Sequence, residues 1–396
     1  MDSDVIILAG GLGTRLRPVV REVPKCMASV AGRPFIAWLL DWLRPSGPCR
    51  VVLSVGYLRK AVEDWVTANA SVYPFEFVFS EEEEPLGTGG GIRLALERCS
   101  SDKVLIINGD TFFNVDLPSF MESASGPVSV ALKPMRDFDR YGEVVTDGIR
   151  ITSFREKAFC AEGLINGGVY YVDRVFLRSV MSSLPERFSF EKEVLESLAG
   201  SPEAGLSGVV SDCYFIDIGV PEDYVRASDE LPQVAEMMSV AGKAAAYRNV
   251  FLDRDGVINR QMVGDYVRRW VDFEFRPGIF DLISRLSGCR ILVVTNQRGV
   301  GRGVMSEEDL LSIHRRMVGE IEAHGGRIDA VYSCTSADKD DPCRKPGKGM
   351  FLRAMEQYPE IVPEGSVMIG DGDVDRDFAA ACGMDFIRVS PFRNDI

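Results

Sequence analysis

Short apolar, β-branched segments alternate with longer stretches of helical character along the first half of the chain. The apolar segments are VIILA, RVVLSV, KVLIIN and PVSVAL, at residues 5–9, 50–55, 103–108 and 127–132. Strands separated by helices form βαβ units around a largely parallel sheet. The pattern therefore predicts an α/β domain in this part of the chain.

A second series of apolar segments begins near residue 249, and most of them end in polar or carboxylate residues. These segments are NVFLDRDG, RILVVTNQ, DAVYSC and GSVMIGDG, at residues 249–256, 290–297, 329–334 and 365–372. Open α/β sheets bind ligands at the carboxyl ends of their strands. We therefore expect a second sheet with a ligand-binding edge of its own.

The stretch between the two series indicates a closing helix, interrupted at Pro232 and followed by small residues. Proline interrupts helices because it lacks an N–H donor and its ring clashes with the preceding turn. A chain of 396 residues also exceeds what one hydrophobic core usually organises. We expect one domain at 1–238, a linker at 239–248 and a second domain at 249–396.

Composition narrows the class of protein. Apolar residues make up 46% and charged residues 26%, as in a folded enzyme, and the net charge of −14 argues against a nucleic-acid surface. No apolar run is long enough to span a membrane, and nine irregularly spaced cysteines fit a reducing compartment. We expect a cytoplasmic enzyme for small anionic ligands, with no membrane or nucleic-acid partner and with homo-oligomerisation left open.

A glycine-rich segment, LAGGLGTRLRP at residues 8–18, follows the first predicted strand. Its glycines allow backbone N–H groups to approach an anion closely, and Arg15 adds a fixed positive charge. A second cation, Lys25, follows a few residues later, whereas the GKS or GKT of a P-loop is absent. These features favour a triphosphate site, although the glycines alone would also suit a tight strand-to-helix connection.

This segment resembles the signature GGxGTRLxPxTxxxPK of the sugar-phosphate nucleotidylyltransferases, with Val19 and Val20 in the threonine region. The segments PLGTGGGI, NGD, RYGEV, FREK, INGGVYYV, FSFEKE and FIDIGVPEDY continue the resemblance in family order. It implies a Rossmann-like, GT-A-like mixed sheet. The implied nucleotide-binding residues are Gly10, Gly11, Gly13, Thr14, Gly87 and Thr88; the implied sugar-phosphate-binding residues are Tyr141, Gly142, Glu143, Lys157, Asn166, Gly167 and Glu191.

The resemblance also implies a mechanism, in which the oxygen of a sugar 1-phosphate attacks the α-phosphorus of a nucleoside triphosphate and releases pyrophosphate. Arg15 and Lys25 would act on the triphosphate, and Asp110 and Asp217 would bind Mg²⁺. Lys157 would bind the incoming phosphate. Each of these residues taken singly could also be a turn, cap or solvated side chain, but their order along the chain favours the functional interpretation.

Two carboxylates stand two residues apart where the fifth predicted strand ends, at Asp253 and Asp255. Side chains at such positions on an extended strand point the same way, so the two negative charges come together and need a cation. Mg²⁺ prefers oxygen ligands such as carboxylates. A DxD pair alone is common and would also suit a surface turn. The pattern is therefore a candidate magnesium site that requires further motifs.

The further motifs resemble those of the haloacid dehalogenase (HAD) superfamily, which implies a HAD-like Rossmannoid domain. VVTNQRGVGRG, CRKPGKGM and MIGDGDVDRD follow DRDG in family order and look most like the D,D-heptose 1,7-bisphosphate phosphatases. By this resemblance Asp253 is the nucleophile and Asp255 the general acid and base, while Asp375 orients its neighbours. Phosphate or sugar-phosphate contacts are implied for Thr295, Asn296, Arg302, Arg344 and Lys345, and magnesium contacts for Asp253, Asp255 and Asp371.

Two departures from the phosphatase pattern affect the metal and the substrate. Relatives carry a zinc loop of CxH and CxC, but here Ser336 and Asp341 replace two ligands, which leaves Cys334 and Cys343. Two thiolates do not complete a tetrahedral structural site, so we expect no structural zinc. Gly372 replaces a lysine that often follows the last motif's aspartate, which leaves the substrate geometry open.

The two resemblances converge on one sugar phosphate. We expect a bifunctional enzyme that removes the C7 phosphate of D-glycero-D-manno-heptose 1,7-bisphosphate and transfers GMP from GTP to D-glycero-α-D-manno-heptose 1-phosphate, using Mg²⁺ in both domains. One alternative keeps both activities on another sugar or nucleotide, as in an ADP-heptose or hexose pathway. A second alternative makes one domain a non-catalytic binding or regulatory module.

Overall fold

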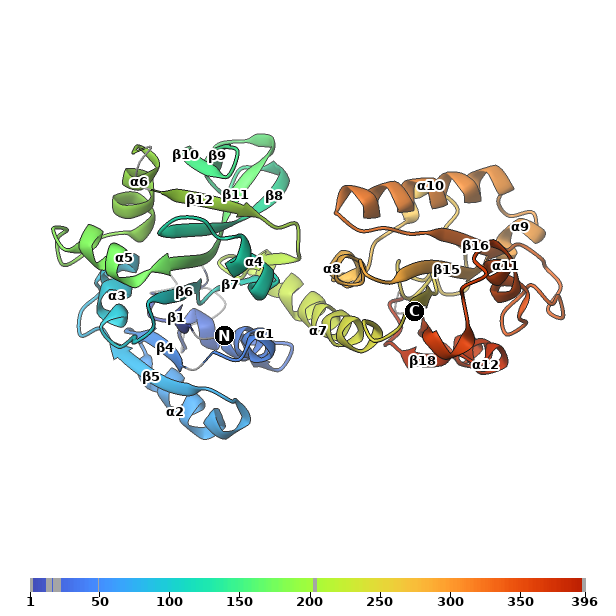
Figure 1. The fold of residues 1–396 in the computed structure, drawn as a ribbon, viewed down its shortest axis with the longest axis horizontal. Helices are drawn as coiled ribbons and strands as arrows, with labels where there is room; N and C mark the ends of the chain where they lie inside the picture. The colour runs from blue at the N-terminus through green and yellow to red at the C-terminus, as the bar shows by residue number, and fades with distance from the viewer. Residues whose placement is uncertain (1–2, 12–15, 17–22, 49, 202–204, 394–396) are drawn as a thin grey trace. The chain divides into compact units, whose positions relative to one another are not determined.

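The computed structural model describes residues 3–11, 16, 23–48, 50–201 and 205–393 (Figure 1). Contacts within the chain divide it into two compact units, residues 1–229 and 230–396. The division lies inside helix α7 (Pro221–Ala244), before the boundary at residue 238 that the sequence suggested. The predicted linker at 239–248 is helical as far as Ala244. No described helix has the length and apolar composition needed to cross a membrane.

Helix α7 continues through Pro232, so the predicted interruption is wrong. Pro232 lies on the exposed side of the helix, whereas Leu231, Val234, Met237 and Val240 on the opposite side are almost fully buried. Burial of each large apolar side chain contributes about 1.5–3 kcal/mol. Together these contacts offset the cost of a proline in a helix interior, about 3 kcal/mol.

The described part of the first unit contains a nine-stranded mixed sheet, ordered β5-β4-β1-β6-β11-β8-β12-β10-β9. Strands β5, β4, β1 and β6 are parallel, and β11 runs antiparallel to both β6 and β8. The four predicted strands are β1, β4, β6 and β8. The bounds are β1 (Asp4–Leu8), β4 (Arg50–Val55), β5 (Glu76–Glu81), β6 (Lys103–Asn108), β8 (Val128–Phe138), β9 (Glu143–Asp147), β10 (Arg150–Phe154), β11 (Cys160–Asp173) and β12 (Leu206–Val210).

Helices and two small ribbons complete the first unit. The helices are α1 (Phe35–Leu43), α2 (Arg59–Asn69), α3 (Gly87–Leu96), α4 (Leu117–Ser123), α5 (Arg174–Met181) and α6 (Ser197–Ala199), with the π-helix η4 (Phe190–Glu196) and the short turns η1 (Lys25–Met27), η2 (Arg44–Ser46) and η3 (Ala70–Val72). The ribbons are β2 (Ser29–Val30) with β3 (Arg33–Pro34), and β7 (Thr111–Phe113) with β13 (Phe215–Asp217). One core joins strand residues such as Ile6 and Val104 to α3, α5 and η4.

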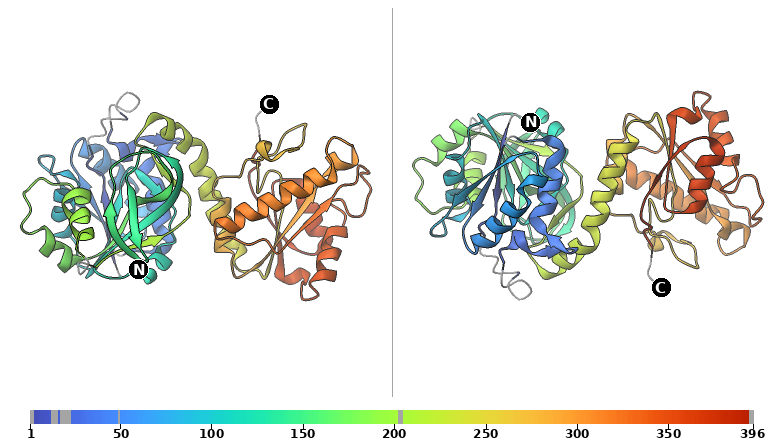
Figure 2. Two further views of the ribbon diagram at one scale, coloured as in Figure 1. Left: turned by 90° about the horizontal axis from the view of Figure 1, so that it is seen from above. Right: turned by 90° about the horizontal axis from the view of Figure 1, so that it is seen from below.

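The second unit contains a five-stranded parallel sheet, ordered β16-β15-β14-β17-β18, and the helices around it (Figure 2). Its strands are β14 (Asn249–Leu252), β15 (Arg290–Asn296), β16 (Ala330–Cys334), β17 (Ser366–Gly370) and β18 (Asp385–Arg388). Its helices are α8 (Ile279–Arg285), α9 (Arg298–Gly301), α10 (Glu307–Ala323), α11 (Gly349–Gln357) and α12 (Asp373–Cys382), with the turns η5 (Trp270–Asp272) and η6 (Pro363–Gly365).

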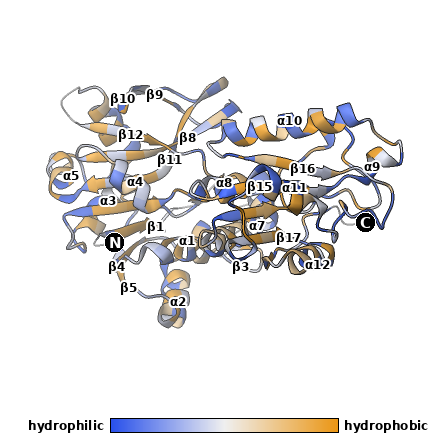
Figure 3. Ribbon diagram, turned by 45° about the vertical axis from the view of Figure 1, so that its right-hand side comes forward, coloured by the Kyte–Doolittle hydropathy of each residue, from blue (hydrophilic) through white to orange (hydrophobic). Residues whose placement is uncertain are grey.

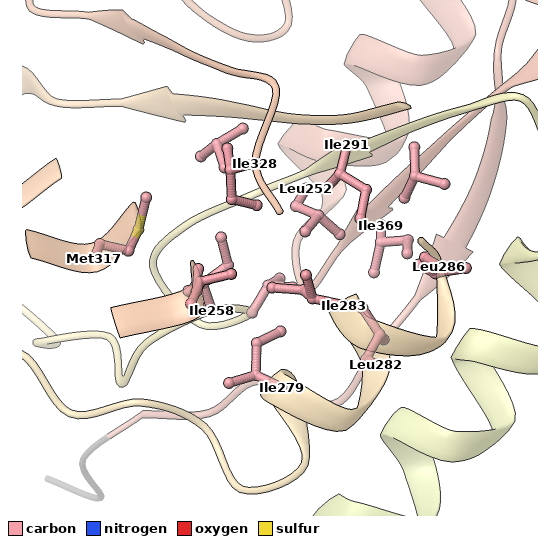
Figure 4. Packing of buried hydrophobic residues seen from close by; sticks show 14 of the residues in the cluster. Leu252, Ile258, Ile279, Leu282, Ile283, Leu286, Ile291, Met317, Ile328 and Ile369 are labelled. Carbon is pink, nitrogen blue, oxygen red and sulfur yellow. The ribbon is translucent and has the colours of Figure 1, made fainter. Parts of the chain in front are cut away.

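Alternating strand residues supply two separate cores in this unit. Leu252 and Ile369 pack with side chains of α7, α8 and α10 on one face, where Figure 4 shows them near Ile283. Phe251 and Met368 pack with α11 and α12 on the other face. Figure 3 shows hydrophobic and hydrophilic residues alternating along α10, as a helix with one buried face requires. The sheet is therefore covered on both faces.

The second half of α7 is tied to the loop that follows β14. Arg276 is about 2% exposed, and its Nη2 donates to Glu236 Oε2 at 2.6 Å. The same guanidinium donates to the carbonyls of Gly256 and Ser390 at 3.1 and 2.7 Å. Glu236 Oε1 also accepts from Ser390 N–H at 2.8 Å. Glu236 thus balances a buried charge beside the end of β14.

We predict that Glu236→Ala destabilises the second unit by about 3 kcal/mol, because it leaves a buried guanidinium without its carboxylate. Differential scanning calorimetry of the full chain measures this as a downward shift of one unfolding transition, the transition of the other unit staying in place. Lys243→Ala, an exposed change on the same helix, is the matched control. Equal shifts for the two variants would contradict the prediction.

Two candidate active sites

The first unit contains a cavity of about 740 Å³ at the carboxyl ends of β1, β4 and β6. Twelve residues predicted as site residues line it: Gly10, Gly11, Lys25, Gly87, Thr88, Asp110, Tyr141, Gly142, Lys157, Asn166, Glu191 and Asp217. Gly13, Thr14 and Arg15 lie outside the described residues. The structure therefore brings segments from Gly10 to Asp217 into one cavity.

Two predicted residues do not line this cavity. Glu143 forms an ion pair with Arg155 at 2.5 Å. Gly167 lies so close to Phe113 that a Cβ atom would come within 2.3 Å of the ring, so glycine is required there by packing. The predicted sugar-phosphate contacts of Glu143 and Gly167 stay predictions.

The short ribbon of β7 and β13 brings the two predicted magnesium ligands together. Asp110 precedes β7, and Asp217 pairs with Thr111 at the end of β13. Ile218 N–H donates to the carbonyl of Asp110 at 3.0 Å, which fixes the two loops against each other. Lys25 Nζ lies 2.8 Å from Asp110 Oδ2. Carboxylates facing one cavity beside a lysine fit a hard cation such as Mg²⁺.

The glycine-rich start of α3 packs against the segment that carries Glu191. Gly87 has a φ of +74°, and a Cβ there would come within 2.5 Å of the Phe188 carbonyl oxygen. Thr88 Oγ1 donates to Glu191 Oε2 at 2.7 Å and accepts from Phe190 N–H at 2.9 Å. The predicted nucleotide loop and the predicted sugar-phosphate segment are therefore one hydrogen-bonded wall.

Glu82, which is not among the residues predicted from the sequence, lines the cavity directly after β5. Its Oε1 accepts from Ser54 Oγ at 3.1 Å, and its Oε2 accepts from Leu86 N–H at 3.0 Å. A Cβ added at Gly91 would come within 2.6 Å of Glu82 Oε1, so the α3 glycines make room for this carboxylate. Its position at a strand end was the available signal, but it stands within a run of four acidic residues that resembles a solvated loop.

In the second unit, neighbouring strands bring three carboxylates together. Asp253 follows β14 and Asp371 follows the adjacent β17, while Asp375 is in the first turn of α12. One ligand atom from each lies within 4.8 Å of the others. Among the described residues this is the one group of three or more such side chains that could hold a metal ion. Its all-oxygen donor set fits Mg²⁺.

Lys345 supplies positive charge to this cluster. Its Nζ lies 2.8 Å from Asp253 Oδ1 and 2.6 Å from Asp375 Oδ1, and the side chain is about 2% exposed. Asn296 positions the segment: its amide donates to the Lys345 carbonyl at 3.1 Å and accepts from the Lys345 N–H at 2.9 Å. The amide of Asn296 therefore holds the backbone of Lys345, and its predicted phosphate contact stays a prediction.

Asp255 does not join the metal group, in contrast to the predicted ligand set. Arg254 Nη2 donates to both of its oxygens, at 2.9 and 3.0 Å. Asn259 Nδ2 donates to Oδ1 at 3.0 Å, and Gln297 Nε2 donates to Oδ2 at 2.7 Å. Asp375, which was expected to orient its neighbours, takes the third place in the cluster. The orientation of the Asp255 carboxylate is thus fixed by donors from Arg254, Asn259 and Gln297.

The remaining predicted residues of this unit lie around the cluster. Thr295 is buried, and its Oγ1 accepts from Gln297 at 2.9 Å. Arg302 is exposed, with Nη1 3.4 Å from Tyr266 Oη. Arg344 is half-buried, and its Nη1 has no hydrogen-bond partner among the described residues.

The loop that replaces the zinc motif forms ordinary turns. Ser336 Oγ accepts from Asp338 N–H at 3.2 Å, and Asp341 Oδ1 accepts from Cys343 N–H at 2.8 Å. Cys334 is buried and Cys343 is half-buried. Ser336 and Asp341 therefore stabilise the loop that leads to Lys345, and the absence of a structural zinc stays a prediction.

Burial and charge set opposite protonation tendencies for the two aspartates of the DxD pair. Burial, together with nearby Asp375, raises the pKa of Asp253, against the lowering effect of Lys345. Burial alone would also raise the pKa of Asp255, but the Arg254 guanidinium and the hydrogen bonds to its oxygens lower it below its usual value. Burial alone would lower the pKa of Lys345, yet its carboxylate partners raise it. Of these two aspartates, Asp253 is therefore the one whose charged form an added cation would stabilise more.

We predict that Mg²⁺ raises the unfolding temperature of the second unit, and that Asp371→Asn removes this stabilisation. A ligand at a hundred times its Kd stabilises the folded state by about 2.7 kcal/mol. Calorimetry of the full chain with and without Mg²⁺ measures the shift. The control is Asp373→Asn, whose carboxylate is about 69% exposed and pairs with Arg388. An unchanged magnesium shift in the Asp371 variant would refute the site.

Comparisons with known proteins agree with this geometry. The model of the nucleotidyl transferase family matches residues 4–234, and a HAD-hydrolase-like model matches residues 342–390. D-glycero-α-D-manno-heptose 1-phosphate guanylyltransferase of Aneurinibacillus thermoaerophilus is 42% identical over 231 residues, covering 58% of this chain and 98% of the relative. The crystal structure of HddC from Yersinia pseudotuberculosis complexed with GMP-PN is 35% identical, covers 57% of this chain and 98% of that chain, and superposes with a TM-score of 0.51.

The second unit has relatives of its own. D-glycero-α-D-manno-heptose-1,7-bisphosphate 7-phosphatase of Mycobacterium bovis is 41% identical over 143 residues, covering 35% of this chain and 75% of the relative. Both resemblances found in the sequence, and the fold class that they imply, are thereby confirmed. The chain belongs to the nucleotidyl transferase family and carries, fused behind that domain, a phosphatase-like domain of the HAD type.

Proposed function

We propose that this chain catalyses two consecutive steps in the synthesis of a nucleotide sugar. The second unit removes the C7 phosphate from D-glycero-α-D-manno-heptose 1,7-bisphosphate. The first unit transfers GMP from GTP to the resulting 1-phosphate and gives GDP-heptose and pyrophosphate. The observation that carries this proposal is that the activities of the two sets of relatives fit together, since a 7-phosphatase makes the substrate of a 1-phosphate guanylyltransferase.

In the first site, the sugar 1-phosphate oxygen forms a bond to the α-phosphorus of GTP while the bond from that phosphorus to the pyrophosphate oxygen breaks. Lys25 and Arg15 would offset charge on the triphosphate, and Lys157 would hold the attacking phosphate in line. Asp110 and Asp217 would hold Mg²⁺, which neutralises phosphate charge when bound. Positioning and charge neutralisation are the main sources of rate in such transfers.

Glu82 supports guanine as the base. A carboxylate offers acceptors alone, and the Watson–Crick edge of guanine presents two adjacent donors, N1–H and the N2 amino group. Uracil and thymine present one donor between two carbonyl acceptors, which a carboxylate would repel. Because Glu82 lines the cavity beside Gly10 and Gly91, we propose that it accepts both guanine donors.

In the second site, Asp253 would attack the C7 phosphorus and form an aspartyl-phosphate, while the sugar oxygen leaves. Lys345 and Thr295 would bind phosphoryl oxygens, and the cluster of Asp253, Asp371 and Asp375 would hold Mg²⁺, which offsets phosphoryl charge. Asp255 would give a proton to the departing oxygen and later take one from water. The unpartnered Nη1 of Arg344 provides a further anion contact.

We also propose a cytoplasmic location for the enzyme. The odd number and irregular spacing of the nine cysteines fit a reducing compartment. Both proposed substrates are phosphorylated metabolites.

Incubation of the full chain with Mg²⁺, each anomer of the bisphosphate and each nucleoside triphosphate tests the whole proposal. We expect phosphate release, and GDP-heptose with pyrophosphate from the α-anomer and GTP, followed by mass spectrometry. Phosphate release without nucleotide sugar under every triphosphate would refute the first activity alone. Nucleotide sugar formed from the 1-phosphate, but no phosphate from the bisphosphate, would refute the second alone.

Glu82→Gln tests the choice of base. We expect kcat/KM with GTP to fall by the equivalent of about 1–3 kcal/mol, the discrimination typical of one bidentate base contact. Activity with UTP or dTTP should rise relative to GTP, because an amide matches a donor flanked by acceptors. Glu84→Gln, two residues along on the exposed loop, is the control. An unchanged nucleotide preference in the Glu82 variant would exclude it as the base-reading residue.

A further inference from the structure

Two buried polar side chains, Arg254 and His314, stand behind Asp255 and take no direct part in the proposed reaction. Arg254 is about 1% exposed and His314 about 6% exposed, so neither can touch a substrate in the open site. Arg254 lies between the two aspartates of the DxD pair in the chain. His314 is a residue of α10, sixty residues away, and lies on the buried face of that helix.

The three side chains form one chain of hydrogen bonds. The His314 ring nitrogen Nε2 lies 3.1 Å from Arg254 Nη1. The opposite edge of the guanidinium faces Asp255, with Nη2 at 2.9 and 3.0 Å from the two carboxylate oxygens and Nε at 3.3 Å from Oδ1. An arginine nitrogen can only donate, so Nε2 of His314 is the acceptor in this contact.

The charge distribution requires that His314 be neutral. Burial lowers the pKa of His314 to about 3, and the adjacent Arg254 charge contributes in the same direction. A neutral imidazole accepts one hydrogen bond and leaves the positive charge of Arg254 for Asp255. An apolar residue in this place would leave a buried N–H donor without a partner, which favours movement of the guanidinium.

We propose that His314 is a positioning residue of the phosphatase site, acting through Arg254 to fix the carboxylate of Asp255. This inference rests on the proposed phosphatase function. During breakdown of the aspartyl-phosphate, a water oxygen bonds to phosphorus, its proton passes to Asp255, and the bond from phosphorus to the Asp253 oxygen breaks. The products are inorganic phosphate and the free Asp253 carboxylate, and Asp255 later loses the proton to solvent.

Geometry explains why Asp255 needs such support. Its two oxygens already accept from Arg254, Asn259 and Gln297, so a small rotation would exchange partners and turn the carboxylate away from the water. The Arg254 fork resists rotation because it contacts both oxygens at once. The fork in turn keeps its direction because His314 holds the far end of the guanidinium.

His314→Leu in the full chain tests the inference with two esters, the heptose bisphosphate and p-nitrophenyl phosphate. Nitrophenolate departs without a proton, so kcat/KM for that ester, which reports formation of the aspartyl-phosphate, should stay close to the original value. The kcat of this variant with p-nitrophenyl phosphate should fall by about 10²-fold, which is the cost of a misplaced reacting group. A burst of nitrophenol should precede the slow turnover. With the bisphosphate, both parameters should fall.

Two further variants separate positioning from folding. His314→Gln keeps an acceptor for Arg254 and should restore most of the lost kcat. Met317→Ala empties a fully buried place on the same helix, where Figure 4 shows the side chain among the core residues. It should lower the unfolding temperature without the nitrophenol burst. Guanylyl transfer by the first unit should be the same in all variants.

The results that would overturn the positioning role of His314 differ from those that would overturn the proposed phosphatase function. A leucine variant with unchanged kcat, a glutamine variant as impaired as the leucine variant, or a burst in Met317→Ala would each overturn the positioning role and leave the phosphatase in place. If the unmutated chain releases phosphate from neither ester, the proposed phosphatase function fails, and the inference that rests on it fails as well.

Discussion

Carboxylates that strand ends bring together need a cation, and in both halves of this protein a lysine supplies one. Lys345 Nζ lies within 2.8 Å of Asp253 and Asp375, and Lys25 Nζ lies 2.8 Å from Asp110. Without such charges, buried carboxylates would bind protons and lose their value as ligands. Each lysine offsets part of this negative charge, while burial still leaves the pKa of Asp253 raised.

Each lysine is held by its own surroundings. The N–H and carbonyl groups of Lys345 are both held by the amide of Asn296, at the end of β15, so the turn before α11 places this cation at the cluster. Lys25 begins η1, and its ion pair joins that turn to the loop between β6 and β7. In each unit, therefore, the turn that holds the lysine places its positive charge beside a carboxylate that is far away in the sequence.

The two sites differ in what surrounds the reacting groups. The nucleotide site is a cavity whose glycines permit close packing, and Glu82, Thr88 and Glu191 give its wall fixed acceptors. The phosphatase site is a compact cluster, in which Lys345 and two backbone N–H groups donate to oxygens of Asp253 and Asp375. A large nucleotide requires room and directional contacts. A single phosphoryl group requires dense charge.

The sequence alone determined the fold class, the strand ends and the residues that gather there, because strands, glycine turns and terminal carboxylates are local patterns of period and composition. Tertiary structure decided which groups face one another. Asp255 turned to Arg254 and Asp375 joined the cluster of Asp253 and Asp371, since both depend on how α10 and α12 pack on the sheet. In the sequence, Glu82 belongs to an acidic run that resembles a solvated loop, and Pro232 resembles the end of a helix. The burial of neighbouring residues in the structure shows that Glu82 lines a cavity and that the helix continues through Pro232. Long-range packing carries energies of several kcal/mol, which exceed the local preferences that a sequence displays.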